Sequence, residues 1–310
     1  MIRKTFTSVL LALAAICNAG AQTAATELDG DVKLMIGNDL GRNGYYEQKT
    51  IAELMGKVAD AVGPDAFLAL GDTHHYMGIE SVNDPLWMTN YELVYSHPEL
   101  QVEWCPILGN HEYRGNTQAV IDYTSVSRRW TMPGRYYTRI FDNDGTRVKV
   151  IFIDTTPIIE KYHTNSSEYP DASLQDVDAQ LQWLDKELSR DDKADWTIVA
   201  GHHPVYAQTR KVDSERADMQ KKLDPILRKH KIDMYLCGHI HNFQHIRKNG
   251  IDYIVNTSGS LSRQDVSETD GTVFCNGNTG FSVLTATPDT LVISMVDSRG
   301  NVIHQVTRSK

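Results

Sequence analysis

Residues 66–75 read Ala-Phe-Leu-Ala-Leu-Gly-Asp-Thr-His-His, a short apolar run that ends in a glycine and several potential metal ligands. A run of this length bounded by a turn residue predicts a buried β-strand. The glycine lets the backbone turn sharply, so that Asp72 can approach a ligand closely. The stretch therefore predicts a strand that delivers a carboxylate at its carboxyl end.

The same arrangement recurs along the chain, each time after an apolar run. The further copies are Gly37-Asn38-Asp39, Gly109-Asn110-His111-Glu112, Gly201-His202-His203 and Gly238-His239-Ile240-His241. In open α/β sheets, ligands bind beyond the carboxyl ends of the strands. We therefore expect all five segments to converge on one site.

The apolar runs also indicate the fold class. Strands are expected at 33–36, 66–70, 102–108, 148–153, 196–200 and 234–236, with amphipathic helices between them at 51–62 and 174–188. The second helix carries Ser173 and Asp176 at capping-box spacing. Further strands are expected at 244–247, 252–256, 281–285, 290–295 and 302–306. Strands separated by helices predict a layered α/β fold, here two sheets packed face to face with helices outside.

The first 21 residues have the features of an export signal. Arg3 and Lys4 precede a short apolar run, and Ala19-Gly20-Ala21 offers a cleavage site. Cys17 could instead carry a lipid anchor, although Ile16 stands where a small residue would be expected. We therefore expect a signal peptide at 1–21, a single catalytic domain at 22–310, and export to the periplasm or the extracellular space. No other stretch is apolar enough to span a membrane.

The composition limits which classes of partner and which metals are expected. The net charge of −9 argues against nucleic acid as the main partner. Cys105, Cys237 and Cys275 show no paired spacing, so a disulfide scaffold is not expected. Carboxylate, amide and imidazole ligands without thiolate suit Fe, Zn, Mn or Co. So many candidate ligands suit two ions sharing a carboxylate, as in hydrolytic two-metal sites.

These segments resemble the calcineurin-like metallophosphoesterases, and within them the purple acid phosphatases of the small, mammalian, tartrate-resistant type. The resemblance covers residues 32–300. It is carried by Leu70–Ile79, Ser81–Pro85, Leu108–His111, Ser127–Trp130 and Val199–Val205. It implies a four-layer α/β/β/α sandwich with a dimetal site at one edge, in which iron pairs with Fe, Zn or Mn.

Carried over by position, the resemblance assigns ligands to both metals. The first takes Asp39, Asp72 and His241; the second takes Asp72 as the bridge with Asn110, His202 and His239. His111 would contact the phosphate or protonate the leaving oxygen, and Asn110 would also lie at the substrate. His203 is either a substrate contact or a packing residue. Asp154 also follows an expected strand, and a structural role explains it at least as well as a role at the site.

One departure concerns the first metal. Where purple members have a tyrosine that ligates ferric iron and gives the colour, this chain has His75, followed by Tyr76. An ungapped alignment makes His75 the ligand, and a backbone bulge would present Tyr76 instead. With His75 the protein should not be purple. A second departure lies after Pro204, where Arg210 and Lys211 are either phosphate contacts or solvated charges.

The implied activity is hydrolysis of small phosphate monoesters by a water whose pKa the metals lower. No covalent phosphoenzyme is expected, because no serine or cysteine occupies a nucleophile position. The alternatives are a phosphodiesterase or nucleotide hydrolase on the same site, a non-catalytic metal- or phosphate-binding protein, and redox chemistry at an iron pair. Residues 155–172 are expected to form a loop near the cleft. The oligomeric state cannot be read from the sequence.

Overall fold

The computed structural model describes residues 28–209 and 213–310. The expected signal peptide, together with Arg210 and Lys211, lies outside the described residues. Within these ranges, no helix is both long enough and apolar enough to cross a bilayer.

Two mixed β-sheets form the centre of the molecule. One has the strand order β13-β12-β11-β1-β2-β3 and the other β10-β8-β9-β7-β6-β5-β4. The first comprises β1 (Val32–Gly37), β2 (Ala66–Ala69), β3 (Glu103–Pro106), β11 (Gly280–Ala286), β12 (Thr290–Asp297) and β13 (Val302–Ser309). The second comprises β4 (Tyr137–Asn143), β5 (Thr146–Phe152), β6 (Trp196–Ala200), β7 (Met234–Cys237), β8 (Phe243–Lys248), β9 (Ile251–Val255) and β10 (Thr272–Asn276).

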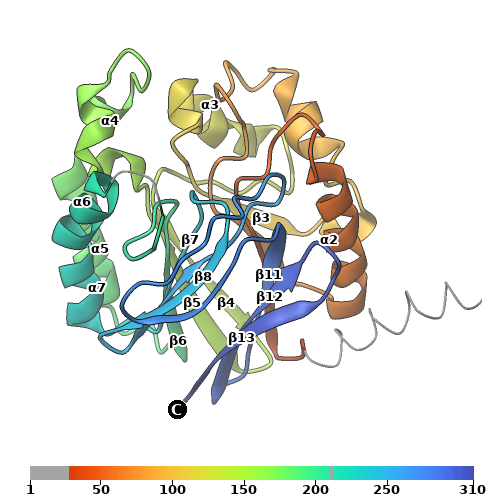
Figure 1. The fold of residues 1–310 in the computed structure, drawn as a ribbon, viewed down its shortest axis with the longest axis vertical. Helices are drawn as coiled ribbons and strands as arrows, with labels where there is room; N and C mark the ends of the chain where they lie inside the picture. Colours follow the sequence, from red (N-terminus) through yellow and green to blue (C-terminus); the bar gives the residue numbers. More distant parts are fainter. Residues whose placement is uncertain (1–27, 210–212) are drawn as a thin grey trace, which may run out of the picture.

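Helices cover the outer face of each sheet. Helix α2 (Gln48–Val62) flanks the first sheet, and α4 (Glu160–Thr164), α5 (Val177–Leu188), α6 (Ser214–Lys222) and α7 (Asp224–His230) flank the second (Figure 1). A short helix, α3 (Thr117–Asp122), follows β3. The result is the α/β/β/α sandwich implied by the resemblance.

The expected start of the second helix was wrong. Asp176 is itself the N-cap of α5, because its carboxylate accepts the backbone N–H of Ala179 at 2.9 Å. Leu174, expected on the buried helical face, precedes the helix and is 75% exposed. Two strands, β4 and β10, were not expected at all.

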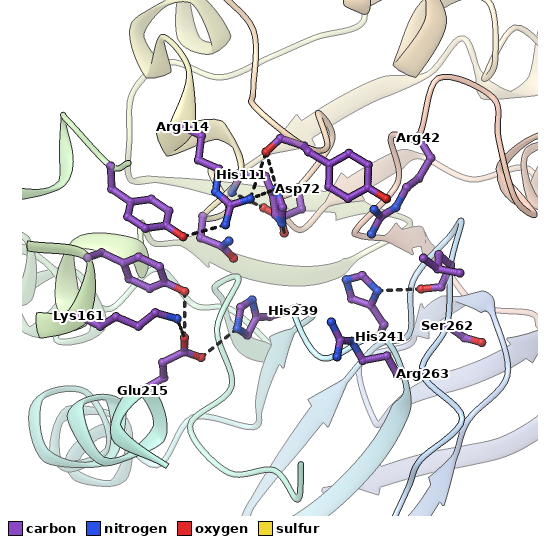
Figure 2. Close-up of a pocket in the computed structure, with 15 residues that line it drawn as sticks. Arg42, Asp72, His111, Arg114, Lys161, Glu215, His239, His241, Ser262 and Arg263 are labelled. Atoms are coloured by element: carbon purple, nitrogen blue, oxygen red, sulfur yellow. Dashed lines mark hydrogen bonds and ion pairs between the residues drawn. The ribbon is translucent and has the colours of Figure 1, made fainter. Parts of the chain in front are cut away.

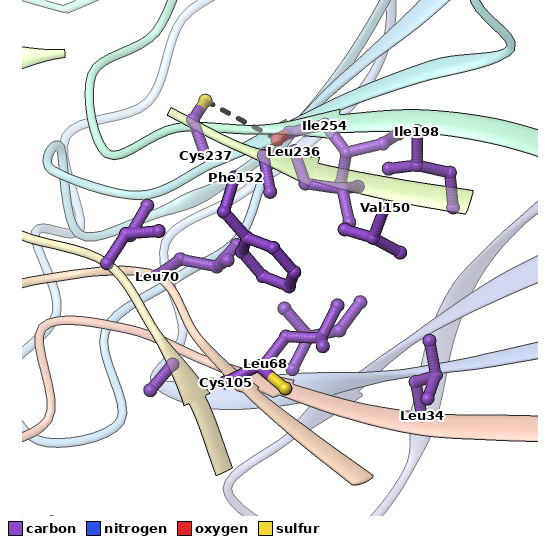
Figure 3. Close-up of a cluster of buried hydrophobic side chains, with 14 of the residues drawn as sticks. Leu34, Leu68, Leu70, Cys105, Val150, Phe152, Ile198, Leu236, Cys237 and Ile254 are labelled. Carbon is purple, nitrogen blue, oxygen red and sulfur yellow. Dashed lines mark hydrogen bonds between the residues drawn. The ribbon is translucent and has the colours of Figure 1, made fainter. Parts of the chain in front are cut away.

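The main core lies between the sheets. Leu34, Leu68 and Cys105 from the first sheet face Val150, Ile198 and Ile254 from the second, and all six are buried (Figure 3). The thiol of Cys237 donates to the carbonyl of Ile254 at 3.4 Å. Cys105 and Cys237 are buried free thiols, as expected, and Cys275 is also free.

Strand direction brings the expected ligands together. Strands β1, β2 and β3 are mutually parallel, as are β5, β6 and β7 in the other sheet. The carboxyl ends of parallel strands meet at one edge of a sheet. The loops that carry the candidate ligands therefore all leave the sandwich at that edge.

Candidate metal centre

The backbone is held in an unusual conformation at four of the candidate ligands. Asp39, Asp72, His239 and His241 have φ values of 50°, 54°, 72° and 58°. This left-handed region is sparsely populated by residues other than glycine, and such residues cluster at functional sites. The tight loops after β1, β2 and β7 thus turn these side chains toward the same point.

Glycines allow the loops to approach one another. A Cβ on Gly109 would lie 2.2 Å from Oδ1 of Asp72, and one on Gly238 would lie 2.1 Å from Nδ2 of Asn38. Neither distance is possible for a real side chain. These glycines are therefore required for the close packing of the ligand loops.

Asp72 lies at the centre of the cluster. Its Oδ1 accepts the backbone N–H of His111 at 2.9 Å. Its Oδ2 lies 3.2 Å from Nε2 of His202 and 3.5 Å from Nε2 of His75. One carboxylate oxygen therefore lies close to two histidines, one from a loop of each sheet, which suits a bridging ligand.

Asp39 forms the other acidic side of the cluster. Its Oδ2 accepts the Asn38 amide at 2.6 Å and the backbone N–H of His239 at 2.9 Å. Its Oδ1 lies 2.9 Å from Nε2 of His241 and 3.9 Å from Nε2 of His75. His75 therefore lies between the two carboxylates.

Backbone carbonyls orient three of the histidines. The Nδ1–H groups of His75, His202 and His241 donate to the carbonyls of Gly41, Leu70 and Leu261 at 3.1, 2.7 and 2.7 Å. Each such bond fixes the tautomer and turns the Nε2 lone pair toward the carboxylates. This is the usual support for a metal-ligating histidine.

The buried polar atoms of the cluster provide a test of whether metal ions fit. Oδ1 of Asp39, Nε2 of His75, Oδ1 of Asn110 and Nε2 of His202 are buried without a hydrogen-bond partner among the residues that the structure describes. Buried polar atoms in native proteins normally have partners. Metal ions would supply these partners, and oxygen and imidazole donors suit the metals expected from the sequence.

A residue that the sequence did not point to supports His239. Oε2 of Glu215, on α6, accepts from Nε2 of His239 at 3.0 Å, so a metal would be bound through Nδ1. Burial by itself would raise the pKa of the Glu215 carboxyl. The hydrogen bonds with His239 and Lys161 outweigh burial and hold the pKa of Glu215 well below its usual value. No motif or spacing in the sequence links α6 to the ligand loops.

Glu112 is a second supporting residue, although it appeared in the sequence only as part of a motif. Its carboxylate accepts the backbone N–H groups of Asp72, His74 and Gly109 at 2.8, 2.9 and 2.7 Å. Burial, and then the charge of Asp72, raise the pKa of Glu112 to about 7. Glu112 thereby ties the loop after β2 to the loop after β3.

The pocket above the cluster has a volume of about 670 Å³ (Figure 2). Asp72, Asn110, His111, His239 and His241 line its floor. Nδ1 of His111 lies 2.8 Å from the Tyr76 carbonyl, and its Nε2 lies 3.9 Å from Oδ2 of Asp72. His111 therefore has one face toward the cluster and one toward the pocket.

The rim of the pocket includes part of the 155–172 segment, which was expected to be a loop near the cleft; the segment does reach the pocket, but it contains the helix α4. Lys161, Tyr162 and Tyr169 line it, together with the cations Arg42, Arg114 and Arg263. The Tyr162 hydroxyl donates to Glu215 at 3.1 Å. This segment therefore shapes the side of the pocket nearest His239.

The structure places the two alternative ligands of the first metal differently. His75 is 2% exposed and lies between the carboxylates, whereas the Tyr76 side chain is 54% exposed. Tyr76 instead lies against Arg42, whose guanidinium carbon is 4.8 Å from its ring centroid. Of the two residues, His75 is thus the one placed within a group that could hold a metal ion.

Two other candidates have structural roles. His203 is fully buried and does not line the pocket; its ring nitrogens are bonded to the hydroxyls of Thr155 and Tyr162 at 2.9 and 3.1 Å. The expectation of a direct substrate contact is therefore corrected to packing behind His239. Asp154 accepts the hydroxyl of Tyr113 at 2.5 Å, away from the cluster.

Comparison with known proteins finds relatives that match most of the chain. The family model described as calcineurin-like phosphoesterase matches residues 32–243. Purple acid phosphatase 7 of Arabidopsis thaliana is 31% identical, with 91% of this chain and 87% of the relative covered. Tartrate-resistant acid phosphatase type 5 of Oryctolagus cuniculus is also 31% identical, with coverages of 84% and 83%.

Among solved structures, one described as GAP50, the anchor in the inner membrane complex of Plasmodium, has a TM-score of 0.78 and 23% identity. It covers 91% of this chain, and the match covers 89% of that structure. The chain belongs to the calcineurin-like phosphoesterase family, in its purple acid phosphatase branch. It is accordingly a metal-dependent, acid phosphatase-like enzyme, and its family implies a dimetal centre.

Proposed function

We propose that the chain is an exported acid phosphatase that hydrolyses small phosphate monoesters at two metal ions. The observation that carries this proposal is the position of Asp72, one of whose carboxylate oxygens lies within 3.5 Å of Nε2 of both His75 and His202. The first ion would be held by Asp39, Asp72, His75 and His241, and the second by Asp72, Asn110, His202 and His239. Iron paired with Fe, Zn or Mn fits these donors.

When bound, the ions supply a nucleophile active at mild pH and neutralise charge on the phosphoryl oxygens. The protein's own groups then orient the substrate. His111 projects into the pocket beside Asp72. Because its Nδ1–H donates to the Tyr76 carbonyl, the ring would give a hydrogen bond to a phosphate oxygen or a proton to the leaving oxygen from Nε2 in its protonated form. Asn110 presents its amide to the same floor.

Turnover of p-nitrophenyl phosphate by the mature protein tests this proposal. The protein would be stripped with a chelator, and Fe, Zn or Mn then restored singly and in pairs. We expect activity to vanish and to return, and Asp72→Asn to prevent its return while Asp154→Asn retains metal-dependent recovery. Absence of turnover with two ions demonstrably bound would refute the proposal.

Two alternatives are separated by the same protein preparation. A phosphodiesterase would turn over bis-p-nitrophenyl phosphate faster than the monoester. A non-catalytic protein would bind metals and phosphate without turnover. A structurally similar Plasmodium protein is described as an anchor. Metal binding is common to all three proteins, so the turnover of the two substrates separates them.

Export is a separate part of the proposal. We infer that residues 1–21 are removed and that 22–310 act as one catalytic unit, since both sheets contribute ligands to one centre. Intact-mass measurement of the protein secreted by its own host would test this. Mature protein that begins near residue 22 agrees with it, and protein that retains Met1 contradicts it.

A further inference from the structure

The cations at the pocket rim fall into two groups. Arg114 pairs with Glu168 at 2.7 Å, and Lys161 pairs with Glu215 at 2.6 Å. Arg42 and Arg263, in contrast, form no ion pair with any of the described residues. In a chain with a net charge of −9, two uncompensated arginines in one pocket call for an explanation.

Arg42 is the more informative of the two. It is only 6% exposed, and its Nε is buried without a hydrogen-bond partner in the part of the chain that the structure describes. Its guanidinium lies against the rings of Tyr76 and Tyr46, at 4.8 and 6.0 Å from their centroids. A buried guanidinium without an acid is costly unless an anion binds there.

The backbone around Arg42 is fixed before any ligand binds. Oε1 of Gln48 accepts the N–H groups of Arg42 and Gly44 at 2.9 and 2.7 Å. The Gln48 amide donates to the carbonyl of Asn90 at 2.9 Å. The position of Arg42 is therefore preorganised, which lowers the entropy lost on binding.

Arg263 lies on the same side of the pocket. Its backbone N–H donates to the carbonyl of His241 at 2.7 Å, which fixes it next to a candidate ligand of the first metal. Figure 2 draws the guanidinium groups of Arg42 and Arg263 on the His241 side of the pocket, away from Arg114 and Lys161. Among the described residues that line the pocket, the cations without an ion pair thus lie on one side.

This side of the dimetal pocket adjoins a second recess. Arg42 and Tyr76 line both that pocket and a neighbouring recess of about 420 Å³, which Tyr45 and Tyr46 complete. A substrate whose scissile phosphate lies over the metals can extend its leaving group toward Arg42 and the mouth of this recess. Arg263 lines the dimetal pocket but not the recess, so an anionic group that stays on this side of the dimetal pocket would be attracted by both arginines.

We propose that Arg42 and Arg263 form a second anion subsite, which selects substrates whose leaving group carries a phosphate of its own. Guanidinium groups bind phosphate through paired, charge-assisted hydrogen bonds, and the two ligand phosphates would then be divided between the metals and the arginines. This inference rests on the proposed function, because it deepens the substrate class of the same pocket.

The test is equilibrium binding by calorimetry to the metal-loaded protein, in buffer that keeps both metals saturating. The probes are methylphosphonate, methylene bisphosphonate and propylene bisphosphonate. The variants are Arg42→Met, Arg263→Met and, as a control, Arg299→Met, which changes an exposed arginine on a turn. The two bisphosphonates distinguish directly linked phosphates from phosphates separated by carbon atoms.

We expect at least one bisphosphonate to bind wild-type protein more tightly than methylphosphonate does. Loss of a charged hydrogen-bonding partner should reduce that preference about tenfold in Arg42→Met and less in the exposed Arg263→Met. Arg299→Met should preserve it. A wild-type protein without the preference, or equal loss for all three probes, would overturn the inference.

The experiment gives a result even if one variant does not fold. If Arg42→Met does not fold, as judged by its melting temperature, Arg263→Met decides the question alone. Failure of the proposed function would appear as absent p-nitrophenyl phosphate turnover by wild-type protein. Failure of this inference would appear as normal turnover without any bisphosphonate preference.

Discussion

Nε2 of His75 lies 3.5 Å from Oδ2 of Asp72, while its Nδ1–H is fixed on the carbonyl of Gly41. A ring nitrogen held in this way, with its lone pair beside a buried carboxylate, is placed to bind a metal ion. The Tyr76 ring lies against Arg42 instead. Under the proposed function, this relationship predicts the colour of the protein, because a ferric ion bound to imidazole would lack the charge-transfer absorption that a phenolate gives.

Iron-loaded wild-type protein should therefore show no intense visible band. His75→Tyr should place a phenolate beside Asp72 and create one, and Tyr76→Phe should leave the wild-type spectrum unchanged. Absorption spectra of the three proteins at equal iron content check this. An intense wild-type band that Tyr76→Phe abolishes would contradict the assignment of His75.

Glu215 should hold His239 in position for the second metal. Replacing it by Gln removes the charge that bonds to Nε2 of His239, and losses of supporting partners typically weaken metal binding by about 10- to 100-fold. Competition against a chelating dye measures the affinity of each metal. Glu160→Gln, at an exposed position on α4, is the control and should bind normally. Unchanged affinity in Glu215→Gln, with only stability reduced, would assign it a purely structural role.

Gly109 should tolerate no side chain. A Cβ there would lie 2.6 Å from the backbone nitrogen of Asp72 as well as against its carboxylate, so Gly109→Ala must displace the loop. We expect a loss of about 1–3 kcal/mol in the free energy of unfolding, the usual range for overpacking. Urea denaturation measures this. Gly134→Ala is the matched control, since its nearest neighbour would lie at 3.8 Å; comparable losses in both would argue against a local clash.

Asp252 should contribute to the acid sensitivity of the fold. Burial pushes its pKa upward, but hydrogen bonds from His245, Arg247 and Arg308 outweigh this and hold the pKa of Asp252 below its usual value. In the unfolded chain, the Asp252 carboxyl has an ordinary pKa of about 3.9. Near that pH, the unfolded chain therefore binds a proton that the folded protein does not. The stabilisation is therefore complete above that pH and is lost as the pH falls through the lower folded pKa.

Asp252→Asn should accordingly be less stable than wild type at neutral pH and lose stability less steeply between about pH 5 and pH 3. Urea midpoints measured across that range check the slope. Asp289→Asn, at an exposed position, should keep the wild-type slope. An unchanged slope in Asp252→Asn would show that other groups dominate acid unfolding.

Much of the fold could be predicted because the central strands are buried on both faces. Strands β2, β6 and β7 are apolar runs, and each was expected close to its observed bounds. Strands β4 and β10 were missed because both are edge strands of the second sheet. An edge strand is half solvated, so β4 carries Arg139 and Asp142 and lacks an apolar pattern.

The sequence by itself determined which residues converge. A ligand that follows directly after a parallel strand must emerge at the carboxyl edge of the sheet, so Asp39, Asp72, Asn110, His202 and His241 could be grouped without a structure. Only the tertiary structure decided which groups support them. Glu215 and Arg42 reach the pocket from a helix and a loop whose approach depends on how the layers pack, and no local pattern encodes that long-range placement. The burial of His203 was decided in the same way, because a histidine after a strand can face either the pocket or the core.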